Sequence, residues 1–392
     1  MINKSIKIIK KSGAYENYNR DKIIAAITKS AERAMYQFKD YEVDYICTTI
    51  EQEIYDMGLD KVPVLTMHNM FENALERVNP KVAKSYKDYR NYKTDFTQML
   101  DSVYQKSQSI MYIGDKENAN TDSALVSTKR SLIFNQFNKE LYQKFFLTVD
   151  EIQACRDGYI YVHDMSARRD TMNCCLFDVR NVLSGGFEMG NVWYNEPNSL
   201  DVAFDVIGDI VLSAASQQYG GFTVPEIDKV LEPYAQKTYD KAYEKYLRIS
   251  GGDVEVAKAE ALADVQKEFE QGFQGLEYKF NTVASSRGDY PFITFTAGLA
   301  TSEFGKMAAI TMFNVRRGGQ GKKKCKKPVL FPKLVFLFDE NLHTEGKENY
   351  DVFEAGIQCS AKTMYPDWLS LTGNGYVASI YKKYGRVISP MG

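Results

Sequence analysis

The sequence predicts an α/β fold in which a small helix-rich domain precedes a larger region of alternating strands and helices. Residues 291–296 and 328–338 are apolar runs rich in Phe, Val, Leu and Ile, which is typical of buried strands. Long stretches with apolar residues at helical spacing lie before and between these runs. At 392 residues the chain is long enough for two or three domains with a sizeable core.

The first predicted domain covers residues 3–95. Strand-like runs at residues 6–9 and 15–18 flank a turn at Gly13, and Asn19 or Asp21 is placed to cap a following helix through residue 31. Three further helices are predicted, at residues 41–57, 64–78 and 82–92. Two short strands followed by helices make a self-contained module. A polar connection is predicted at residues 96–122.

The region 123–392 alternates helices with short apolar runs. Thr148 and Gly158 are predicted to cap one helix, and a strand is predicted at residues 159–163, ending at Asp164. A long helix is expected to break at Gly220-Gly221. The predicted helices are 123–137, 138–146, 149–157, 198–218, 225–246 and 254–273. Strands alternating with helices over this length imply an α/β architecture.

Composition and charge exclude several classes of function. The formal net charge is -2, which gives no general reason to expect a nucleic-acid partner. The longest apolar stretch, residues 329–338, contains Pro332 and Lys333 and is too short to span a bilayer. The N-terminus carries lysines with no apolar run behind them, so no signal peptide is visible. We therefore predict a cytoplasmic protein without a membrane partner.

The segment 316–327 is the strongest local concentration of positive charge. It could bind phosphate or nucleic acid, but it contains no aromatic residue and no Gly-Lys-Ser/Thr ending. An exposed loop before a buried strand is the favoured interpretation. The six cysteines show no C-x-x-C spacing, so no metal site is predicted, and adjacent Cys174 and Cys175 are not expected to bridge each other.

The segment 10–23, with residues 83–86 and 89–90 at the far end of the first domain, resembles the ATP-cone, a regulatory nucleotide-binding domain. The resemblance assigns nucleotide binding to Lys10, Glu16, Asn19 and Lys22, with ATP as activator and dATP as inhibitor. The chemistry fits: lysines attract phosphates, Glu16 can accept from a base or ribose hydroxyl, and Asn19 stands near a helix N-terminus that favours anions. The alternative is an ordinary basic hairpin with a helix cap.

A second set of segments follows in one order through the rest of the chain: residues 117–120, 158–164, 173–174, 185–191, 197–199, 219–221, 331–335, 364–367 and 388–392. They resemble the anaerobic (class III) ribonucleoside-triphosphate reductases, which are glycyl radical enzymes. The resemblance implies an α-rich ATP-cone followed by an incomplete ten-stranded α/β barrel of the ribonucleotide reductase type.

The resemblance also implies roles for particular residues. Cys174, on the first barrel strand, would lie beneath the ribose and supply reducing equivalents as the 2′-hydroxyl leaves. Cys175 would point to the other face of the strand. Asn173 would donate a hydrogen bond to the ribose or the reductant, and His163 would orient or protonate groups near the leaving hydroxyl. The alternative for His163 is a strand-end histidine bonded to backbone; the histidines at 68 and 343 are expected to be structural or exposed.

Three features of the family are missing from this sequence. The thiyl cysteine that follows Pro-Met-Gly in the family would come after Gly392, and the glycyl radical loop and the four zinc-binding cysteines would lie beyond it. The radical and the zinc are therefore expected only in a separate C-terminal portion. We predict that this polypeptide alone does not reduce nucleotides, and that an intein, a split gene or a truncated reading frame separates the parts.

Several partners follow for the complete enzyme. These are a ribonucleoside triphosphate substrate, the C-terminal reductase portion, a radical S-adenosylmethionine iron-sulfur activase, formate or a thioredoxin-like reductant, and a second copy in a homodimer. Two alternatives remain open. One is a pyruvate formate-lyase-like glycyl radical enzyme, whose adjacent catalytic cysteines resemble Cys174-Cys175. The other is a non-catalytic sensor that binds ATP or dATP.

Overall fold

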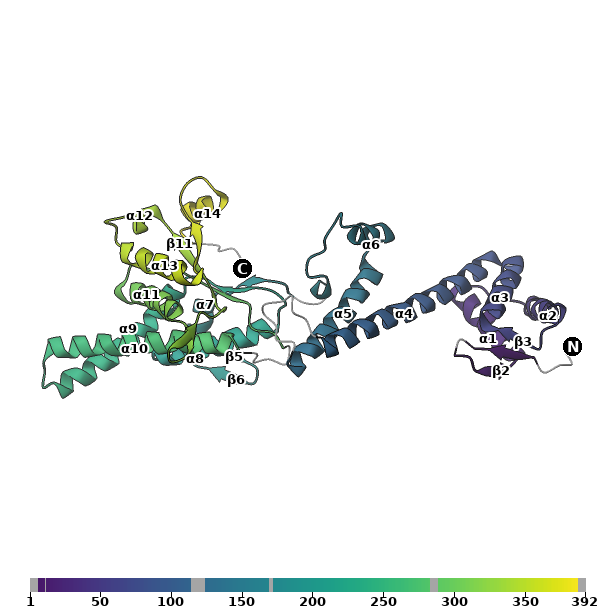
Figure 1. The fold of residues 1–392 in the computed structure, drawn as a ribbon, viewed down its shortest axis with the longest axis horizontal. Helices are drawn as coiled ribbons and strands as arrows, with labels where there is room; N and C mark the ends of the chain where they lie inside the picture. The colour runs from purple at the N-terminus through teal and green to yellow at the C-terminus, as the bar shows by residue number, and fades with distance from the viewer. Residues whose placement is uncertain (1–5, 11, 114–123, 169–171, 283–287, 387–392) are drawn as a thin grey trace. The chain divides into compact units, whose positions relative to one another are not determined.

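The computed structural model describes residues 6–10, 12–113, 124–168, 172–282 and 288–386. The chain divides into two compact units, Met1–Tyr104 and Gln105–Gly392, and Figure 1 traces the elements of each. Residues 114–122 of the predicted connection, with the motif at 117–120, lie outside the described residues, and so do the last residues, 387–392.

The N-terminal unit joins a small sheet to a set of helices. Strand β1 (Lys7–Ile9) pairs antiparallel with β2 (Tyr15–Asn17) and parallel with β3 (Lys61–Pro63), which the sequence did not predict. The helices are α1 (Arg20–Arg33), α2 (Asp40–Asp56), α3 (Val64–Val78) and the start of α4 (Pro80–Tyr112). The predicted cap of α1 is confirmed, because Asn19 Oδ1 accepts a hydrogen bond of 2.8 Å from the Asp21 amide.

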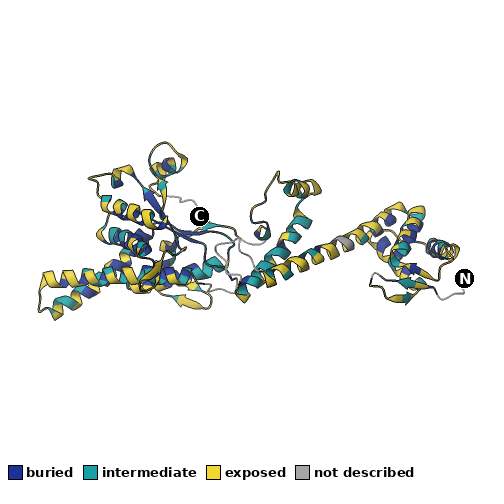
Figure 2. Ribbon diagram, viewed as in Figure 1, coloured by how far each residue is buried: buried dark blue, intermediate teal, exposed yellow. Residues whose placement is uncertain are grey.

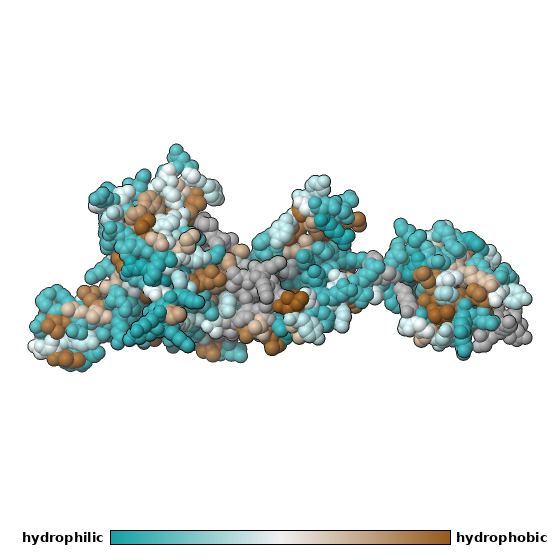
Figure 3. Space-filling view, viewed as in Figure 1, coloured by the Kyte–Doolittle hydropathy of each residue, from teal (hydrophilic) through white to brown (hydrophobic). Residues whose placement is uncertain are grey.

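Apolar residues at helical spacing form the core of this unit. Ile27 of α1, Ile46 and Ile50 of α2, and Ala74 and Leu75 of α3 are completely buried. In Figure 2 the buried side of each helix faces its neighbours and the exposed side faces solvent. On the side shown in Figure 3, a hydrophobic area of the unit is surrounded by hydrophilic residues.

A five-stranded parallel sheet forms the centre of the second unit, and the predicted α/β class is confirmed. The strand order is β12-β11-β8-β7-β4, and every neighbouring pair is parallel. The strands are β4 (Cys175–Leu176), β7 (Phe222–Val224), β8 (Ile293–Ala297), β11 (Lys333–Phe338) and β12 (Asp367–Ser370). The central strands β7 and β8 are buried along their whole length, as expected for a parallel sheet covered by helices.

Several helices lie beside this sheet (Figure 1), and α10 packs against α8, α9 and α11. The helices are α5 (Val126–Phe146), α6 (Val149–Arg156), α7 (Val179–Leu183), α8 (Leu200–Ser216), α9 (Ile227–Ile249), α10 (Val254–Phe280), α11 (Glu303–Gly318), α12 (Glu340–His343), α13 (Tyr350–Thr363) and α14 (Tyr376–Tyr384). A 3-10 turn, η1 (Met165–Ala167), and two hairpins, β5 (Phe187–Met189) with β6 (Val192–Tyr194) and β9 (Gln320–Lys322) with β10 (Cys325–Lys327), complete the unit. No helix among the described residues combines the length and apolarity needed to cross a bilayer.

Some predicted elements are wrong. Residues 159–163 form no strand: Tyr159 and Tyr161 are 84% and 85% exposed, so the run has no partner surface to bury it. The helices predicted at 123–137 and 138–146 are the single helix α5, in which Asn138 is a buried interior residue. Residues 96–112, predicted as a connection, continue α4, because no Gly or Pro interrupts the chain after Pro80. The capping box at Thr148 is confirmed.

The basic segment 316–327 is also more ordered than predicted. Its first residues end α11, and the rest forms the β9–β10 hairpin, in which Lys322 to Lys327 are exposed. The prediction of an exposed segment is confirmed for Lys322 to Lys327 and is wrong for Arg316 and Gln320, which are buried. The exposed part belongs to a hairpin and not to a loop. Likewise, the strand predicted at 328–338 begins only at Lys333, after Pro332.

Three buried side chains hold the backbone that follows β8. Asp228 Oδ2 accepts from the Gly298 and Ala300 amides at 2.9 and 3.3 Å. Asn349 Nδ2 donates to the carbonyl oxygens of the same two residues at 3.0 and 2.9 Å. His343 Nε2 lies 2.8 Å from the Gly298 carbonyl oxygen, and burial lowers the pKa of this histidine. His343 is therefore structural, one of the two expectations for it.

Asp228 should make stability depend on pH. Burial raises the pKa of Asp228 from 3.8 to about 6, against the opposing effect of its backbone donors. Since the folded pKa lies above the unfolded value, this carboxyl group stabilises the fold at low pH, and the contribution is lost as pH rises through about 6. A shift of two units corresponds to about 3 kcal/mol. The Asp228→Asn variant should lack this decrease in stability. The measurement is the free energy of unfolding in urea, compared between pH 4.5 and pH 7.

The matched control is Asp240→Asn, which changes an exposed carboxylate on the same helix, α9. The free energy of unfolding of this control should change with pH in the same way as that of the unchanged chain. An Asp228→Asn profile parallel to the control would show that Asp228 does not carry the pH dependence.

Candidate functional site

A cavity of about 250 Å³ in the N-terminal unit brings together the four nucleotide-binding residues predicted from the sequence. The β1–β2 hairpin supplies one wall, α1 another, and α3 and α4 the third. Its polar lining includes Lys10, Glu16, Asn19, Lys22, His68 and Tyr86. The remaining lining is largely aliphatic and aromatic, including Ile8, Met67 and Phe71. An apolar hollow with a few convergent polar groups is typical of small-molecule sites.

The charged groups of this cavity pair with one another. Glu16 forms ion pairs with both Lys10 and Lys22. The side chain of Lys22 is 61% exposed and that of Lys10 is 45% exposed, so both ammonium groups are open to an incoming anion. Two lysines sharing one carboxylate leave an excess of positive charge at the rim, which suits a phosphate chain.

The opposite wall contains residues that sequence reasoning missed. His68 was expected to be structural or exposed, but it is half-buried in the cavity wall with its Nδ1 atom 2.5 Å from the Tyr86 hydroxyl oxygen. Burial raises the pKa of Tyr86 to about 12, which keeps the hydroxyl neutral. Phe71 packs edge-on against the Tyr86 ring at 4.4 Å. A usable signal was the helical spacing of Val64, Met67, His68 and Phe71, which puts them on one face of α3.

A polar network behind the cavity ties the second strand to two helices. The Tyr18 hydroxyl donates to Glu51 at 3.1 Å, and Arg20 pairs with Glu51 at 2.8 Å and with Asp44 at 2.5 Å. Burial, with Glu51 as a second cause, raises the pKa of Tyr18, so its hydroxyl remains a donor. Because Tyr18 also lines the cavity, this network fixes the position of the wall that carries Glu16.

In the second unit, the predicted thiol stands at the amino edge of the parallel sheet. Cys174 directly precedes β4, and its Sγ atom accepts from the Gly221 amide at 3.3 Å. The backbone around it is fixed by two more bonds, from Gly220 N to Asn173 O at 2.5 Å and from Cys175 N to Gly221 O at 3.0 Å. The thiol is half-buried, and the Asn173 side chain beside it is exposed.

Gly220 shows why the sequence needs glycine opposite this thiol. A Cβ atom at position 220 would lie 2.7 Å from the Asn173 carbonyl oxygen, the Asn173 Oδ1 atom and the Cys174 Sγ atom. No side chain fits in that space, so the glycine pair that follows α8 allows the two segments to approach closely. Asn173 Oδ1 and Cys174 Sγ therefore face the same small region.

The two adjacent cysteines have different surroundings. Cys175 Sγ donates to Gln218 Oε1 at 3.0 Å and packs against the hydrophobic core. Burial raises the pKa of the Cys175 thiol. Successive residues of a strand alternate between faces, which explains why Cys174 and Cys175 do not share an environment. All six cysteines are free thiols.

His163 is placed differently from Cys174. It lies in irregular chain, its side chain is 69% exposed, and its Nε2 atom is 3.0 Å from Asp164 Oδ2. Its backbone carbonyl accepts from Arg168 Nε at 2.9 Å. Within the described residues, no hydrogen bond joins His163 to Asn173 or Cys174. In the same ranges, no group of three or more His, Cys, Asp or Glu side chains could hold a metal ion.

The amino edge continues across the sheet with an aromatic ring and an ammonium group. Phe292 directly precedes β8, and its ring is 3.4 Å from the Cβ position of Gly221. Lys333, the first residue of β11, holds its Nζ atom 4.5 Å from the centroid of the same ring. Residues 331–335 are one of the segments that resemble the reductase family, and no role was predicted for Lys333 from the sequence.

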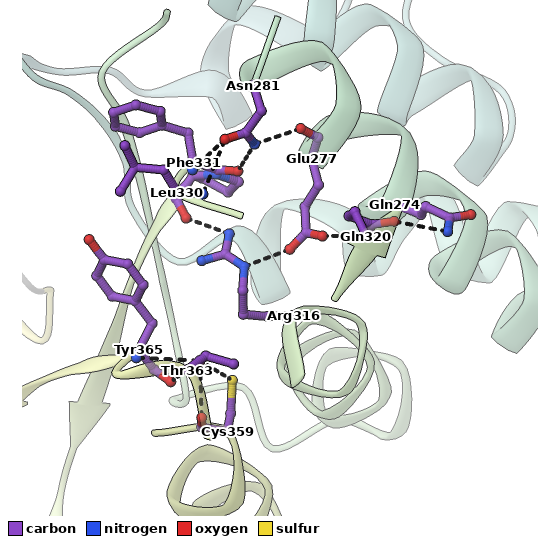
Figure 4. Close-up of polar contacts among 11 residues, drawn as sticks. Gln274, Glu277, Asn281, Arg316, Gln320, Leu330, Phe331, Cys359, Thr363 and Tyr365 are labelled. Atoms are coloured by element: carbon purple, nitrogen blue, oxygen red, sulfur yellow. Dashed lines mark hydrogen bonds and ion pairs between the residues drawn. The ribbon is translucent and has the colours of Figure 1, made fainter. Parts of the chain in front are cut away.

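A buried polar cluster, shown in Figure 4, holds the segment that leads into β11. Arg316 is completely buried; its Nε donates to Glu277 at 2.7 Å and its Nη2 to the Pro332 carbonyl at 2.6 Å. Asn281 accepts from the Leu330 and Phe331 amides at 3.1 Å and donates to the Phe331 carbonyl at 2.6 Å. This Arg316 cluster, with Gln320 bonded to Glu277, therefore sets where Lys333 begins its strand.

Gly220→Ala should disturb the thiol directly. The added Cβ would overlap Asn173 and the Cys174 sulfur, so the segments must separate, and we expect a loss of about 1–3 kcal/mol in unfolding free energy. The rate of Cys174 alkylation, followed by peptide mass spectrometry, should change at the same time. Gly318→Ala is the control, because nothing lies within 4 Å of its Cβ position. Equal unfolding free energies and equal rates of Cys174 alkylation in the two variants would contradict this description of the site.

Comparison with known proteins adds two matches to protein families. The model of the anaerobic ribonucleoside-triphosphate reductase family matches residues 117–392, and the ATP cone domain matches residues 6–95. The chain is 32% identical to the anaerobic ribonucleoside-triphosphate reductase of Haemophilus influenzae and 30% identical to that of Escherichia coli. Each of these matches covers 98% of this chain.

The chain spans about half the length of these curated relatives, 54% and 53%. The corresponding protein of Enterobacteria phage T4 is 34% identical over 70% of this chain and 44% of its own. Among solved structures, the anaerobic ribonucleotide reductase of Thermotoga maritima with citrate in the active site gives a TM-score of 0.48 at 12% identity, covering 72% of this chain and 54% of that one.

Proposed function

The chain belongs to the anaerobic ribonucleoside-triphosphate reductase family, and we propose that it is the nucleotide-regulated front part of such an enzyme. The observation that carries the proposal is the Cys174 thiol, held against Gly220-Gly221 at the amino edge of the sheet beside Asn173. The family match over residues 117–392 leaves no support for a pyruvate formate-lyase-like alternative. We place the reaction in the cytoplasm.

In the proposed reaction, the 2′-hydroxyl of a ribonucleoside triphosphate leaves as water and a hydrogen takes its place. This is a two-electron reduction, and the Cys174 thiol is the hydrogen donor nearest the ribose. The electrons come finally from formate or a thioredoxin-like protein. The C-terminal portion carries the glycyl radical that starts the reaction, and a separate iron-sulfur activase installs this radical. Zinc belongs to the same C-terminal portion. The complete enzyme works as a homodimer.

Asn173 and His163 have supporting roles in this proposal. The Asn173 amide lies beside the thiol, where it can hydrogen-bond to the ribose or to the reductant. His163 is exposed and paired with Asp164, so it meets substrate only if the nucleotide or the remaining portion of the enzyme covers it. Histidine is a common general acid in enzymes, so its imidazole suits proton transfer to a leaving hydroxyl.

The cavity of the N-terminal unit is the proposed effector site, where ATP activates and dATP inhibits. Lys10 and Lys22 would hold the phosphates, Asn19 would fix the start of α1, and Glu16 would accept from the ribose or base. The wall of Met67, His68, Phe71 and Tyr86 fits a flat heterocycle. This cavity lies entirely within the N-terminal unit, so nucleotide binding does not require the rest of the chain.

Removing one lysine should weaken nucleotide binding by a measurable factor. A hydrogen bond to a charged phosphate contributes about 1.5–3 kcal/mol, so Lys22→Met should raise the dissociation constant for ATP by at least about 10-fold. Lys10→Met should behave similarly, and isothermal titration calorimetry measures both. Lys29→Met is the matched control, an exposed lysine of α1 outside the cavity. Unchanged ATP affinity in both cavity variants would rule out this site.

The reductase proposal is tested by complementation. The chain is mixed anaerobically with a polypeptide carrying the C-terminal portion of a relative, the activase and formate or a thioredoxin-like reductant, and deoxynucleotide formation is measured. Activity should appear only in the mixture, vanish with Cys174→Ala, and persist with Cys325→Ala, which changes an exposed thiol in the β9–β10 hairpin. Activity that survives Cys174→Ala would refute the assigned role. Absence of activity, with ATP still bound, would favour the non-catalytic nucleotide sensor.

A further inference from the structure

We propose that the β9–β10 hairpin binds double-helical DNA, without sequence preference, through its lysine side chains. The net charge of the whole chain gives no reason to expect such a partner, so the proposal rests on the hairpin alone. It goes beyond the proposed function, because none of these side chains lines the nucleotide cavity or bonds to Cys174. The hairpin lysines are Lys322, Lys323, Lys324, Lys326 and Lys327.

The charge of the hairpin lysines is not compensated within the protein. All five side chains are exposed. Within the residues that the structure describes, no carboxylate forms an ion pair with any of them, and none of their ammonium groups donates a hydrogen bond. A ligand that brings negative charge to the hairpin therefore displaces no internal partner, and its attraction to the five ammonium groups is not reduced by neighbouring acidic residues.

Lys324 has a backbone conformation that glycine would adopt more easily. Its φ angle is 70°, in the left-handed region. Only Lys323 and Lys324 connect the two strands, and residues with positive φ in such tight turns are usually Gly, Asn or Asp. The chain therefore keeps a positive charge at the turn in spite of a strained backbone. A strained residue of this kind indicates that its side chain has a function of its own.

The base of the hairpin is fixed to the core of the second unit. Gln320, the first residue of β9, is buried; its side chain accepts from Gln274 Nε2 at 3.1 Å and donates to Glu277 (Figure 4). A Cβ atom at position 319 would lie 2.8 Å from the Lys327 carbonyl oxygen, so Gly319 allows the two ends of the hairpin to close tightly. The anchored base therefore holds the lysines in a defined arrangement and not on a free loop.

The hairpin carries positive charge on both of its faces and at its end. Lys327 pairs with Gln320, and Lys326 pairs with Gly321. Successive residues of a strand point to opposite faces, so Lys326 and Lys327 place their charges on opposite faces of the ribbon. The two lysines of the turn add charge at the end of the ribbon. A ligand that uses all of these charges must offer negative groups on more than one side, as a groove with two charged walls does.

Double-helical DNA is the polyanion that this arrangement fits best. Its major groove is about 12 Å wide, admits a two-stranded β-ribbon, and lies between two phosphate backbones. The hairpin contains no aromatic side chain on which the bases of a single strand could stack. The major groove of double-helical RNA is too narrow for side chains to enter. An acidic protein fits less well, because lysine is depleted at protein interfaces and the hairpin has no large apolar side chain for a buried centre.

Fluorescence anisotropy with the full chain tests the proposal. Two labelled DNA duplexes of about 20 base pairs and unrelated sequence are titrated with the protein at several salt concentrations between about 50 and 200 mM. We expect the same dissociation constant for both sequences. The logarithm of the association constant should fall with the logarithm of the salt concentration with a slope of about -4.5, which is about 0.9 for each of five phosphate contacts. Single-stranded DNA, duplex RNA and polyglutamate, titrated in the same way, should bind more weakly.

Three variants decide whether the hairpin is responsible. Lys323→Gln combined with Lys326→Gln should reduce the steepness of the salt dependence by about 2 and weaken binding by about 50-fold at about 0.1 M salt. Lys347→Gln combined with Lys362→Gln removes the same charge from exposed lysines outside the hairpin and should match the unchanged chain. Lys324→Gly removes one charge and relieves the positive φ, so it should reduce the steepness by about 1 without loss of stability in urea. This third variant keeps the test valid if the double variant in the hairpin is unstable.

Several outcomes would overturn the inference. One is the absence of duplex binding at about 50 mM salt, and another is equal affinity and equal salt dependence in the hairpin variants and the control. Single-stranded DNA or duplex RNA bound as tightly as duplex DNA would also contradict it. Polyglutamate bound as tightly would assign the hairpin to an acidic protein partner instead. The complementation assay for reductase activity contains no DNA, so each proposal can fail without the other.

Discussion

The buried ion pair between Arg316 and Glu277 is the interaction on which the second unit depends most. The two side chains are 0% and 5% exposed, so neither charge is solvated and each relies on the other. Removing one partner of such a pair typically costs about 3–5 kcal/mol, because the remaining charge is left buried without compensation. The pair joins α10 to α11, and its bonds to Gln320 and Pro332 extend to the β9–β10 hairpin and the entrance of β11.

The hydrophobic core and its helices also fix the residues at the amino edge of the parallel sheet. A parallel sheet aligns the starts of its strands, and its position depends on the helices that cover it. Here the start of β11 is held by Arg316 and Asn281, and that of β4 by the main chain of Gly220 and Gly221. The thiol is placed by backbone hydrogen bonds and close packing and not by a long side chain. Small residues are therefore as important to this site as reactive ones.

Sequence reasoning predicted the α/β class and the caps at Asn19 and Thr148, because those depend on local patterns. The four residues to which the resemblance assigned nucleotide binding line one cavity of the N-terminal unit. Sequence reasoning failed where an element or a contact depends on residues far apart in the chain. Strands β4 and β7 have two and three residues, too few for a periodic signal, and residues 159–163 look like a strand but find no neighbour. His68 and Tyr86 meet across two helices, and Lys333 meets Phe292 across two strands. No spacing along the chain reports such contacts.

The β9–β10 hairpin has a consequence for how the molecule behaves in solution. Five lysines lie within residues 322–327 of a chain whose formal net charge is only -2. The charge of the whole molecule is therefore a poor guide to the field near this hairpin, which is strongly positive over a few ångströms. At low ionic strength, a cation-exchange resin should hold the chain even above its isoelectric point of about 6.1. Salt at about 0.1 M shortens the range of that field to about 10 Å and should release the chain from the resin.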